Sequence, residues 1–185
     1  MFDNGNHVVL RRDGVAVVLK TPQNEMPQVE YWGRDFGVSG AEGELSALDA
    51  MTLKVTPPAE KPDAALRPSL LPQGAEAFAG RPGLEAYRGT APVFVRWTTV
   101  ETQVAHSGHE LLVHAKDAVN LVELDVRLSL AEGGLVLMDE RITNIDMEHE
   151  EPLTVNWLDS VLPIPRRADH LTQFTGRWPL EKQPQ

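Results

Sequence analysis

The sequence contains no cysteine, and no long run of apolar residues occurs in it. The absence of cysteine excludes a disulfide scaffold, a thiolate metal site and a catalytic thiol, and it is compatible with a reducing compartment. The first residues lack the basic and apolar regions of a secretory signal, and no stretch approaches the about 20 apolar residues of a membrane-spanning helix. We therefore expect a cytoplasmic protein without a membrane partner.

Basic residues are also scarce relative to acidic ones. The chain has 17 Lys and Arg against 27 Asp and Glu, which gives a formal net charge of −10. A field of that sign repels phosphate backbones, so nucleic acid is not an expected partner. Apolar residues make up 42% of the 185 residues, and with 14 glycines this composition is typical of a globular chain with one main core.

Apolar residues recur mostly with the two-residue period of β-strands. In residues 122–130 aliphatic side chains alternate with polar ones, the pattern of an antiparallel strand with one dry and one wet face. Hairpin signals follow at 131–134 and recur at Asp13-Gly14 and Ser107-Gly108. The apolar faces of several such hairpins must pack against one another. The pattern predicts an all-β fold, an antiparallel sandwich of two packed sheets with one or two short helices, the best helix candidate being residues 44–53.

Residues 55–92 are rich in proline and glycine, which break regular elements. This composition predicts a long irregular loop. A loop of such length inside a compact domain is usually a functional lid or binding loop, or else a disordered connection.

Candidate catalytic and metal-binding residues are few. His106, His109 and His114 lie near one predicted hairpin, but metal binding would need further ligands, so a surface position is the favoured interpretation. The acidic run at 146–151 lacks the glycine of a calcium loop and is interpreted as a solvated connection. Serine-hydrolase, phosphate-loop and dinucleotide signatures do not occur. The residues alone thus predict no catalytic group, no metal and no cofactor.

The four tryptophans suggest stacking against a sugar. Trp97 and Trp157 lie in alternating strands, where packing within the sandwich is the favoured interpretation. Trp32 ends a strand beside Gly33, where a ring can stay partly exposed, so Trp32 is a candidate sugar-binding residue. On these grounds a carbohydrate-binding module, an oligomerisation domain and a fragment of a larger protein are all open.

Three motifs, in order along the chain, resemble the landmarks of one family. Residues 31–37 read Y-W-G-R-D-F-G; residues 68–72 read P-S-L-L-P and are followed by G-R-P-G-L at 80–84; L-P-I-P at 162–165 precedes G-R-W at 176–178. The set resembles the amino-terminal region of bacterial glycoside hydrolase family 36 α-galactosidases, particularly the actinobacterial type. Each motif is short, whereas three in register are specific.

The resemblance implies a galactose-mutarotase-like β-supersandwich over residues 1–165 and, at 166–185, the start of a linker toward a (β/α)₈ catalytic barrel. In that family the barrel carries two catalytic aspartates, in K-W-D-x-N and S-D motifs, and hydrolyses terminal α-galactosides of the melibiose and raffinose type with retention. Neither motif occurs in these residues. The resemblance therefore implies a chain that is inactive by itself and needs no cofactor.

The resemblance also implies partners and binding residues. In that family the amino-terminal domain packs on its own barrel, takes part in oligomers and lends loop residues to the rim of a neighbouring subunit's active site, where the α-galactoside oligosaccharide binds. Arg67 aligns with a family arginine in this loop, and Asp63 is a further candidate beside Trp32. The alternative is a free-standing carbohydrate-binding or lectin-like sandwich that uses Trp32 and the loop at 57–88.

Overall fold

The computed structural model describes residues 7–37, 39–52, 68–76, 78, 80–148, 151–164, 168–170, 172, 174–177 and 180–184. Within these ranges the chain forms antiparallel sheets, one α-helix and three short 3₁₀ turns. The 3₁₀ turns are η1 (Gly74–Glu76), η2 (His106–Gly108) and η3 (Glu132–Gly134).

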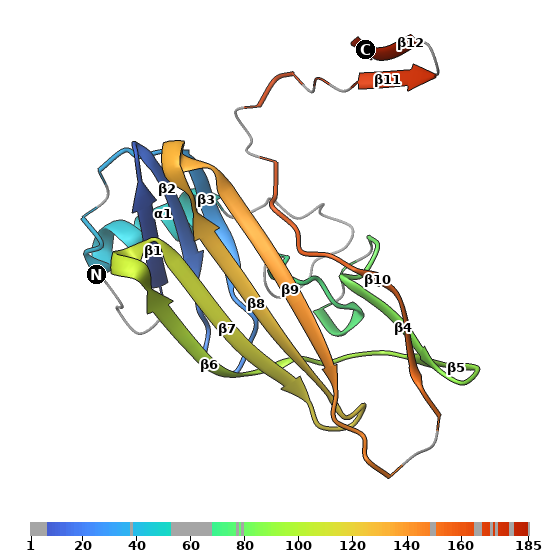
Figure 1. Ribbon diagram of the computed structural model, residues 1–185. Helices are drawn as coiled ribbons and strands as arrows, with labels where there is room; N and C mark the ends of the chain where they lie inside the picture. Colours follow the sequence, from blue (N-terminus) through green and yellow to red (C-terminus); the bar gives the residue numbers. More distant parts are fainter. Residues whose placement is uncertain are drawn as a thin grey trace, which may run out of the picture.

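The largest sheet has four antiparallel strands in the order β6-β7-β8-β9 (Figure 1). These strands are β6 (Thr98–Ala105), β7 (Glu110–Asp117), β8 (Val122–Leu130) and β9 (Val136–Asn144). The alternation predicted at 122–130 is confirmed in β8, where every second side chain is buried: Val122, Leu124, Val126, Leu128 and Leu130. The other face of the sheet carries charged side chains that pair across the strands, such as Arg127 with Asp139.

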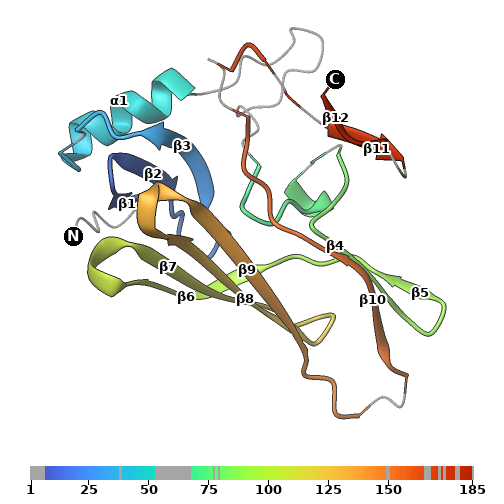
Figure 2. The same cartoon turned by 45° about the horizontal axis from the view of Figure 1, so that its top comes forward.

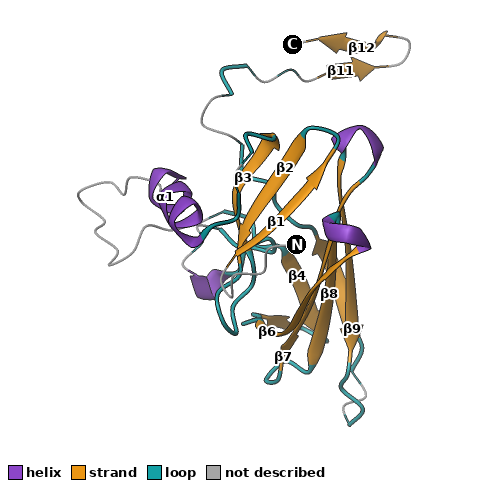
Figure 3. Cartoon of the chain, turned by 90° about the vertical axis from the view of Figure 1, so that its left-hand side faces the viewer, coloured by secondary structure: helices purple, strands orange, loops and turns teal. Residues whose placement is uncertain are grey.

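A second sheet has the order β1-β2-β3 and comprises β1 (His7–Arg12), β2 (Val15–Lys20) and β3 (Gln28–Arg34). Asp13 and Gly14 connect β1 to β2 with φ of 49° and 78°, the positive values that a two-residue hairpin turn requires. The helix α1 (Glu42–Thr52) covers the face of this sheet that is turned away from β6–β9 (Figure 3), where Leu45 packs against Val9 and Val18. No helix among the described residues is long and apolar enough to cross a membrane.

The third sheet, in the order β10-β4-β5, corrects the prediction of an irregular chain up to residue 92. Its strands are β4 (Leu84–Arg88), β5 (Ala91–Val93) and β10 (Leu153–Leu158). Leu84 and Ala86 alternate with polar neighbours and are buried. Pro92 lies in β5, which among the described strands pairs with β4 alone, an edge position at which the missing N–H of proline is tolerated. Among the described residues, the irregular chain therefore ends at Gly83 and not at residue 92.

The main core lies between two layers (Figures 1 and 2). Strands β6–β9 form one layer, and the sheets β1-β2-β3 and β10-β4-β5 together form the other. Both layers contribute fully buried aliphatic side chains, among them Leu10, Leu19, Leu111, Leu124 and Leu128. This arrangement confirms the predicted antiparallel two-layer sandwich.

Hydrogen bonds between turns join the two layers at one end of the sandwich. The Nη1 of Arg12 donates to the carbonyl of Leu130 at 3.0 Å, and the backbone N–H of Gly133 donates to Asp13 Oδ2 at 2.8 Å. The turn between β1 and β2 is thereby fixed on the turn between β8 and β9.

The last described strands pair with each other. β11 (Phe174–Arg177) and β12 (Leu180–Pro184) form an antiparallel hairpin. In Figures 1 and 3 this hairpin lies apart from the sandwich, at the end of the segment that follows β10.

Candidate functional site

The three motifs noted in the sequence meet at one short segment, residues 159–163, here called the junction segment. The indole N–H of Trp32 donates to the carbonyl of Pro163 at 2.7 Å. The N–H of Val161 donates to the carbonyl of Leu70 at 2.8 Å, and the N–H of Asp159 donates to the carbonyl of Gly83 at 2.9 Å. The motifs thus hold one another in place through long-range hydrogen bonds.

The structure places one of the three sequence-predicted binding residues. Trp32 lies on β3 with its ring half-buried against the main core, and its N–H is engaged by Pro163. Asp63 and Arg67 lie outside the described residues. The description resumes at Pro68, and the adjoining Ser69 forms an antiparallel bridge with Gln28. Trp32 is thus built into the junction of the motifs, with part of its ring accessible.

The side chains of the three histidines near the β6–β7 hairpin each have one hydrogen-bonding neighbour among the described residues, which for His109 is the carbonyl of Arg11. Nδ1 of His114 lies 2.8 Å from Asp125 Oδ1 on the outer face of the large sheet, and His106 contacts Glu110. In the part of the chain that the structure describes, no three His, Asp or Glu side chains come together as metal ligands.

The two tryptophans expected in strands differ in their surroundings. Trp97 lies in the connection between β5 and β6 and not in a strand, which corrects that part of the prediction. Trp97 is 3% exposed and belongs to the main core, as predicted. Trp157, on β10, is half-buried and carries the guanidinium of Arg81 over its ring, 3.7 Å from the centroid. Arg81 also forks onto Glu85 with N···O distances of 3.0 and 2.9 Å, and these hydrogen bonds raise the pKa of Arg81 and lower that of Glu85. Arg81 therefore joins β4 and β10 on the surface.

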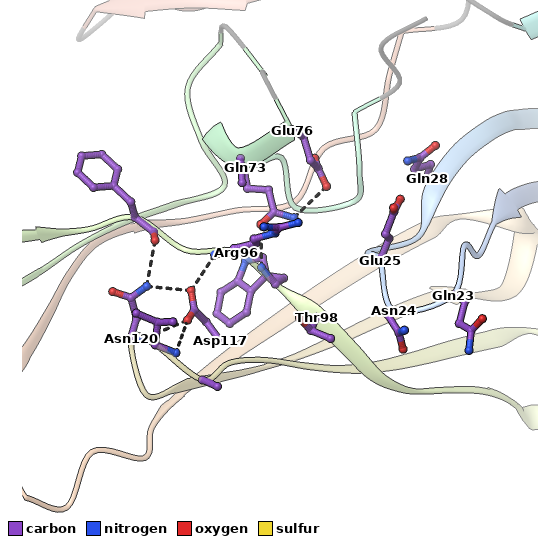
Figure 4. Close-up of a pocket in the computed structure, with 15 residues that line it drawn as sticks. Gln23, Asn24, Glu25, Gln28, Gln73, Glu76, Arg96, Thr98, Asp117 and Asn120 are labelled. Atoms are coloured by element: carbon purple, nitrogen blue, oxygen red, sulfur yellow. Dashed lines mark hydrogen bonds between the residues drawn. The ribbon is translucent and has the colours of Figure 1, made fainter. Parts of the chain in front are cut away.

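A cleft in the described residues has a volume of about 880 Å³ and is lined by four separate segments. They are the connection between β2 and β3, the chain around η1, the connection between β5 and β6, and the turn between β7 and β8. Figure 4 shows the polar side chains that these segments contribute to the lining. The lining comprises Gln23, Asn24, Glu25, Gln28, Gln73, Ala75, Glu76, Phe94, Arg96, Trp97, Thr98, Asp117, Ala118, Val119 and Asn120.

One wall of the cleft is organised around the buried carboxylate of Asp117. It accepts hydrogen bonds from the backbone N–H groups of Arg96, Val119 and Asn120 and from the side-chain amide of Asn120, at 2.7 to 2.9 Å. Burial alone raises the pKa of Asp117, but these four hydrogen bonds outweigh it and lower the pKa below its ordinary value of 3.8. The same amide donates to the carbonyl of Phe94 at 2.9 Å. Asp117 therefore fixes the β5–β6 connection against the β7–β8 turn.

A second wall is held by Gln73 and Glu76. Gln73 Oε1 accepts the backbone N–H of Trp97 at 2.8 Å, and its amide donates to Glu76 Oε1 at 2.9 Å. The other oxygen of Glu76 accepts the hydroxyl of Ser69 at 2.8 Å. Both carboxylates of the two walls are thus already engaged by protein donors.

The remaining side of the cleft is polar but without such bonds. Among the described residues, the side chains of Gln23, Asn24, Gln28 and Arg96 have no hydrogen-bond partner, and all four residues line the cleft (Figure 4). The buried indole Nε1 of Trp97 likewise has no partner there. The site therefore combines two preformed walls with free amides.

Sequence reasoning missed this cleft. The only local signals are the polar run Gln23-Asn24-Glu25 between two prolines and the Asp117–Asn120 turn, which reads as a turn and not as a site. Only the packing of the two layers brings four segments from residues 23–120 together.

Replacement of Asp117 by asparagine is expected to lower the free energy of unfolding by about 1–3 kcal/mol at pH 7, because an amide NH₂ would face the donors of Arg96 and Asn120. The lowered pKa means that the carboxylate stabilises the fold above pH 3.8, the ordinary value of an aspartate, and that this stabilisation is lost as the pH falls through the lowered pKa. The deficit of the variant should therefore shrink below about pH 4.

Urea unfolding at pH 7 and at about pH 3 measures both effects. Asp139→Asn, at a carboxylate that is 59% exposed, is the control and should cost less than about 1 kcal/mol. An equal loss in the two variants at pH 7 would contradict the role given to Asp117.

Known proteins share this architecture. A solved α-galactosidase from Lactobacillus brevis superposes with a TM-score of 0.68 at 15% sequence identity, over 100% of this chain and 28% of that one. A family 36 α-galactosidase from Geobacillus stearothermophilus superposes with a TM-score of 0.60 at 15% identity, over 83% of this chain and 24% of that one. At this identity the likeness shows the fold, and the fold is that of one part of a larger protein.

Sequence relatives agree with the fold. An α-galactosidase of Escherichia coli is 29% identical over 119 residues, which are 63% of this chain and 16% of that protein. The chain thus spans about a sixth to somewhat more than a quarter of the relatives that it matches. The model of the glycosyl hydrolase family 36 N-terminal domain matches residues 25–185. The motifs at residues 31–37, 68–84 and 162–178 fall inside that match, and the chain belongs to the family of glycosyl hydrolase family 36 N-terminal domains.

Proposed function

We propose that this chain is the non-catalytic amino-terminal domain of a cytoplasmic α-galactosidase that hydrolyses terminal α-galactosides with retention. The match of the family model over residues 25–185 is the observation that carries this proposal. The α-galactosidase of Escherichia coli supports it, and one solved relative from Geobacillus stearothermophilus is a complex with raffinose. The substrate expected for the whole enzyme is thus an oligosaccharide of the melibiose and raffinose type.

The proposal assigns structural roles to this chain and catalysis to a separate barrel, because the two catalytic motifs of the family do not occur in these residues. Residues 1–165 would form the sandwich, and residues 166–185, with the β11–β12 hairpin, would lead toward a (β/α)₈ barrel that carries both catalytic aspartates. The domain would pack on this barrel and support an oligomer. Arg67 and Asp63, with Trp32, would contribute to the rim of the substrate site. The firm anchoring of Ser69 on Gln28 supports a fixed position for the chain that follows Arg67.

The first test concerns catalysis. The 185-residue chain is expected to release no nitrophenol from p-nitrophenyl α-galactoside, since it carries neither the K-W-D-x-N nor the S-D motif. An enzyme in which this domain precedes the barrel is expected to release it. Turnover by the chain alone, or its absence in the longer enzyme, would overturn the assignment.

The second test concerns the rim. In the barrel-containing enzyme, Arg67→Ala should raise KM for raffinose about tenfold and change kcat less, because a rim contact contributes mainly to ground-state binding. Arg141→Ala is the matched control, since Arg141 is exposed on the outer face of the large sheet. An unchanged KM in Arg67→Ala would remove Arg67 from the substrate site.

A further inference from the structure

The charges that a ligand in this cleft could reach nearly cancel. The cleft is the one lined by the β2–β3 and β5–β6 connections, the chain around η1 and the β7–β8 turn. Asp117 accepts four hydrogen bonds and Glu76 accepts two, all from protein donors. The ionised groups left over are the anion Glu25 and the cation Arg96. Such a balance disfavours a polyvalent anion or a metal ion and favours a neutral polar ligand.

The free groups of the cleft are mainly carboxamides. Gln23, Asn24 and Gln28 each present a donor NH₂ beside an acceptor oxygen, and none of these side-chain carboxamides has a hydrogen-bond partner among the described residues. The guanidinium of Arg96 adds donors in a planar fork. Adjacent donors and acceptors suit the hydroxyl groups of a sugar, because each hydroxyl both donates and accepts.

Apolar groups border the same cleft. Phe94 is 82% exposed and Val119 is 90% exposed, although both are held in place by the hydrogen bonds around Asn120. An exposed aromatic ring next to polar groups offers a surface for the C–H face of a pyranose. The wall also contains Trp97, whose buried Nε1 has no partner among the described residues.

We propose that this cleft binds a neutral oligosaccharide, with Gln23, Asn24, Gln28 and Arg96 contacting its hydroxyl groups and Phe94 contacting a ring face. The volume of about 880 Å³ lies in the upper part of the about 300–1,000 Å³ that ligand pockets occupy, which suits two or three sugar rings better than one. This inference goes beyond the proposed function, because it concerns a second saccharide site that is built from described residues of this chain and needs no barrel.

Nuclear magnetic resonance of the ¹⁵N-labelled 185-residue chain tests the proposal, with raffinose, melibiose and maltotriose as probes. At least one probe should shift the side-chain NH₂ signals of Gln23, Asn24 and Gln28 saturably, with a Kd of about 0.1–10 mM. The double variant Gln28→Met/Arg96→Met removes the contacts but keeps side-chain length, and should weaken binding about tenfold or more. The double variant Gln103→Met/Arg141→Met, on the outer face of the large sheet, should bind as the unaltered chain does.

Circular dichroism and Tm show whether the variants fold. If Gln28→Met/Arg96→Met unfolds, the exposed single variant Gln23→Ala replaces it and should still weaken binding severalfold. No saturable shift with any of the three probes would overturn the proposal, and so would shifts that spare the cleft or equal affinity in the cleft variants. Because binding by the chain alone is measured, failure here leaves the galactosidase assignment standing. If the galactosidase assignment fails instead, the binding measurement still tests the saccharide site.

Discussion

Replacement of Arg88 by alanine is expected to lower the free energy of unfolding by about 3–5 kcal/mol. Arg88 lies on β4 and its Nη1 is 3.3 Å from Asp146 Oδ2, in a pair whose side chains are 16% and 2% exposed. Its Nη2 donates to the carbonyl of Asn120 and to Asn144 Oδ1, both at 2.8 Å. Arg88 thus joins β4 to the β7–β8 turn and to the chain that follows β9.

The cost arises because the variant leaves the buried carboxylate of Asp146 without this cation and the half-buried carbonyl of Asn120 without this donor. Urea unfolding followed by tryptophan fluorescence measures it. Arg127→Ala is the matched control: Arg127 also pairs with an aspartate, at 2.8 Å, but the two side chains are 54% and 59% exposed, so the loss should stay below about 1 kcal/mol.

A second variant separates the buried charge from the lost packing. Arg88→Met/Asp146→Leu removes both ions and should recover part of the stability lost in Arg88→Ala, because no isolated charge remains buried. If Arg88→Ala cost no more than Arg127→Ala, the network around Arg88 would contribute nothing beyond an ordinary surface pair.

Replacement of Gly134 by alanine is expected to cost about 2–4 kcal/mol. Gly134 ends η3 with φ of +75°, a left-handed conformation that is unfavourable for residues with a Cβ atom. A Cβ at this position would overlap the side chain of Val15 and lie 3.3 Å from the carbonyl of Arg12. The β1–β2 hairpin therefore packs directly against Gly134.

The neighbouring Gly133 gives the control for this variant. It has φ of +74°, but a Cβ there would meet nothing within 4 Å, so Gly133→Ala should cost only the conformational term of about 1–2 kcal/mol. The difference between the two free energies of unfolding, from urea titrations, measures the steric contribution alone. Equal losses would show that the layers do not meet closely at this turn.

The sequence predicts the elements whose hydrogen bonds are local. In β8 the apolar alternation suffices, and at Asp13-Gly14 the tolerance of both residues for positive φ specifies the turn between β1 and β2. The strand β4 is not predicted from the sequence because it is short and follows a proline-rich segment. It is stabilised by β10, a partner distant in the sequence.

The site is less predictable than the fold. Trp32 stands out in the sequence as an aromatic residue at a strand end, yet its hydrogen bond to Pro163 cannot be foreseen from either neighbourhood. The cleft depends on where four connections lie after the layers have packed, and polar residues such as Gln28 have no periodicity that would mark them. Tertiary packing, not local preference, creates both features.

The junction segment also affects the order in which the domain can mature during synthesis. Trp32 and Pro163 are 131 residues apart, so at about 5–20 residues per second the ribosome needs on the order of ten seconds to supply the acceptor after the donor has appeared. The β1–β2 hairpin closes locally and needs no such delay. The carbonyls of Leu70 and Gly83, like Trp32, find their partners only after the junction segment has been synthesised, so these contacts between the motifs can form at the same stage.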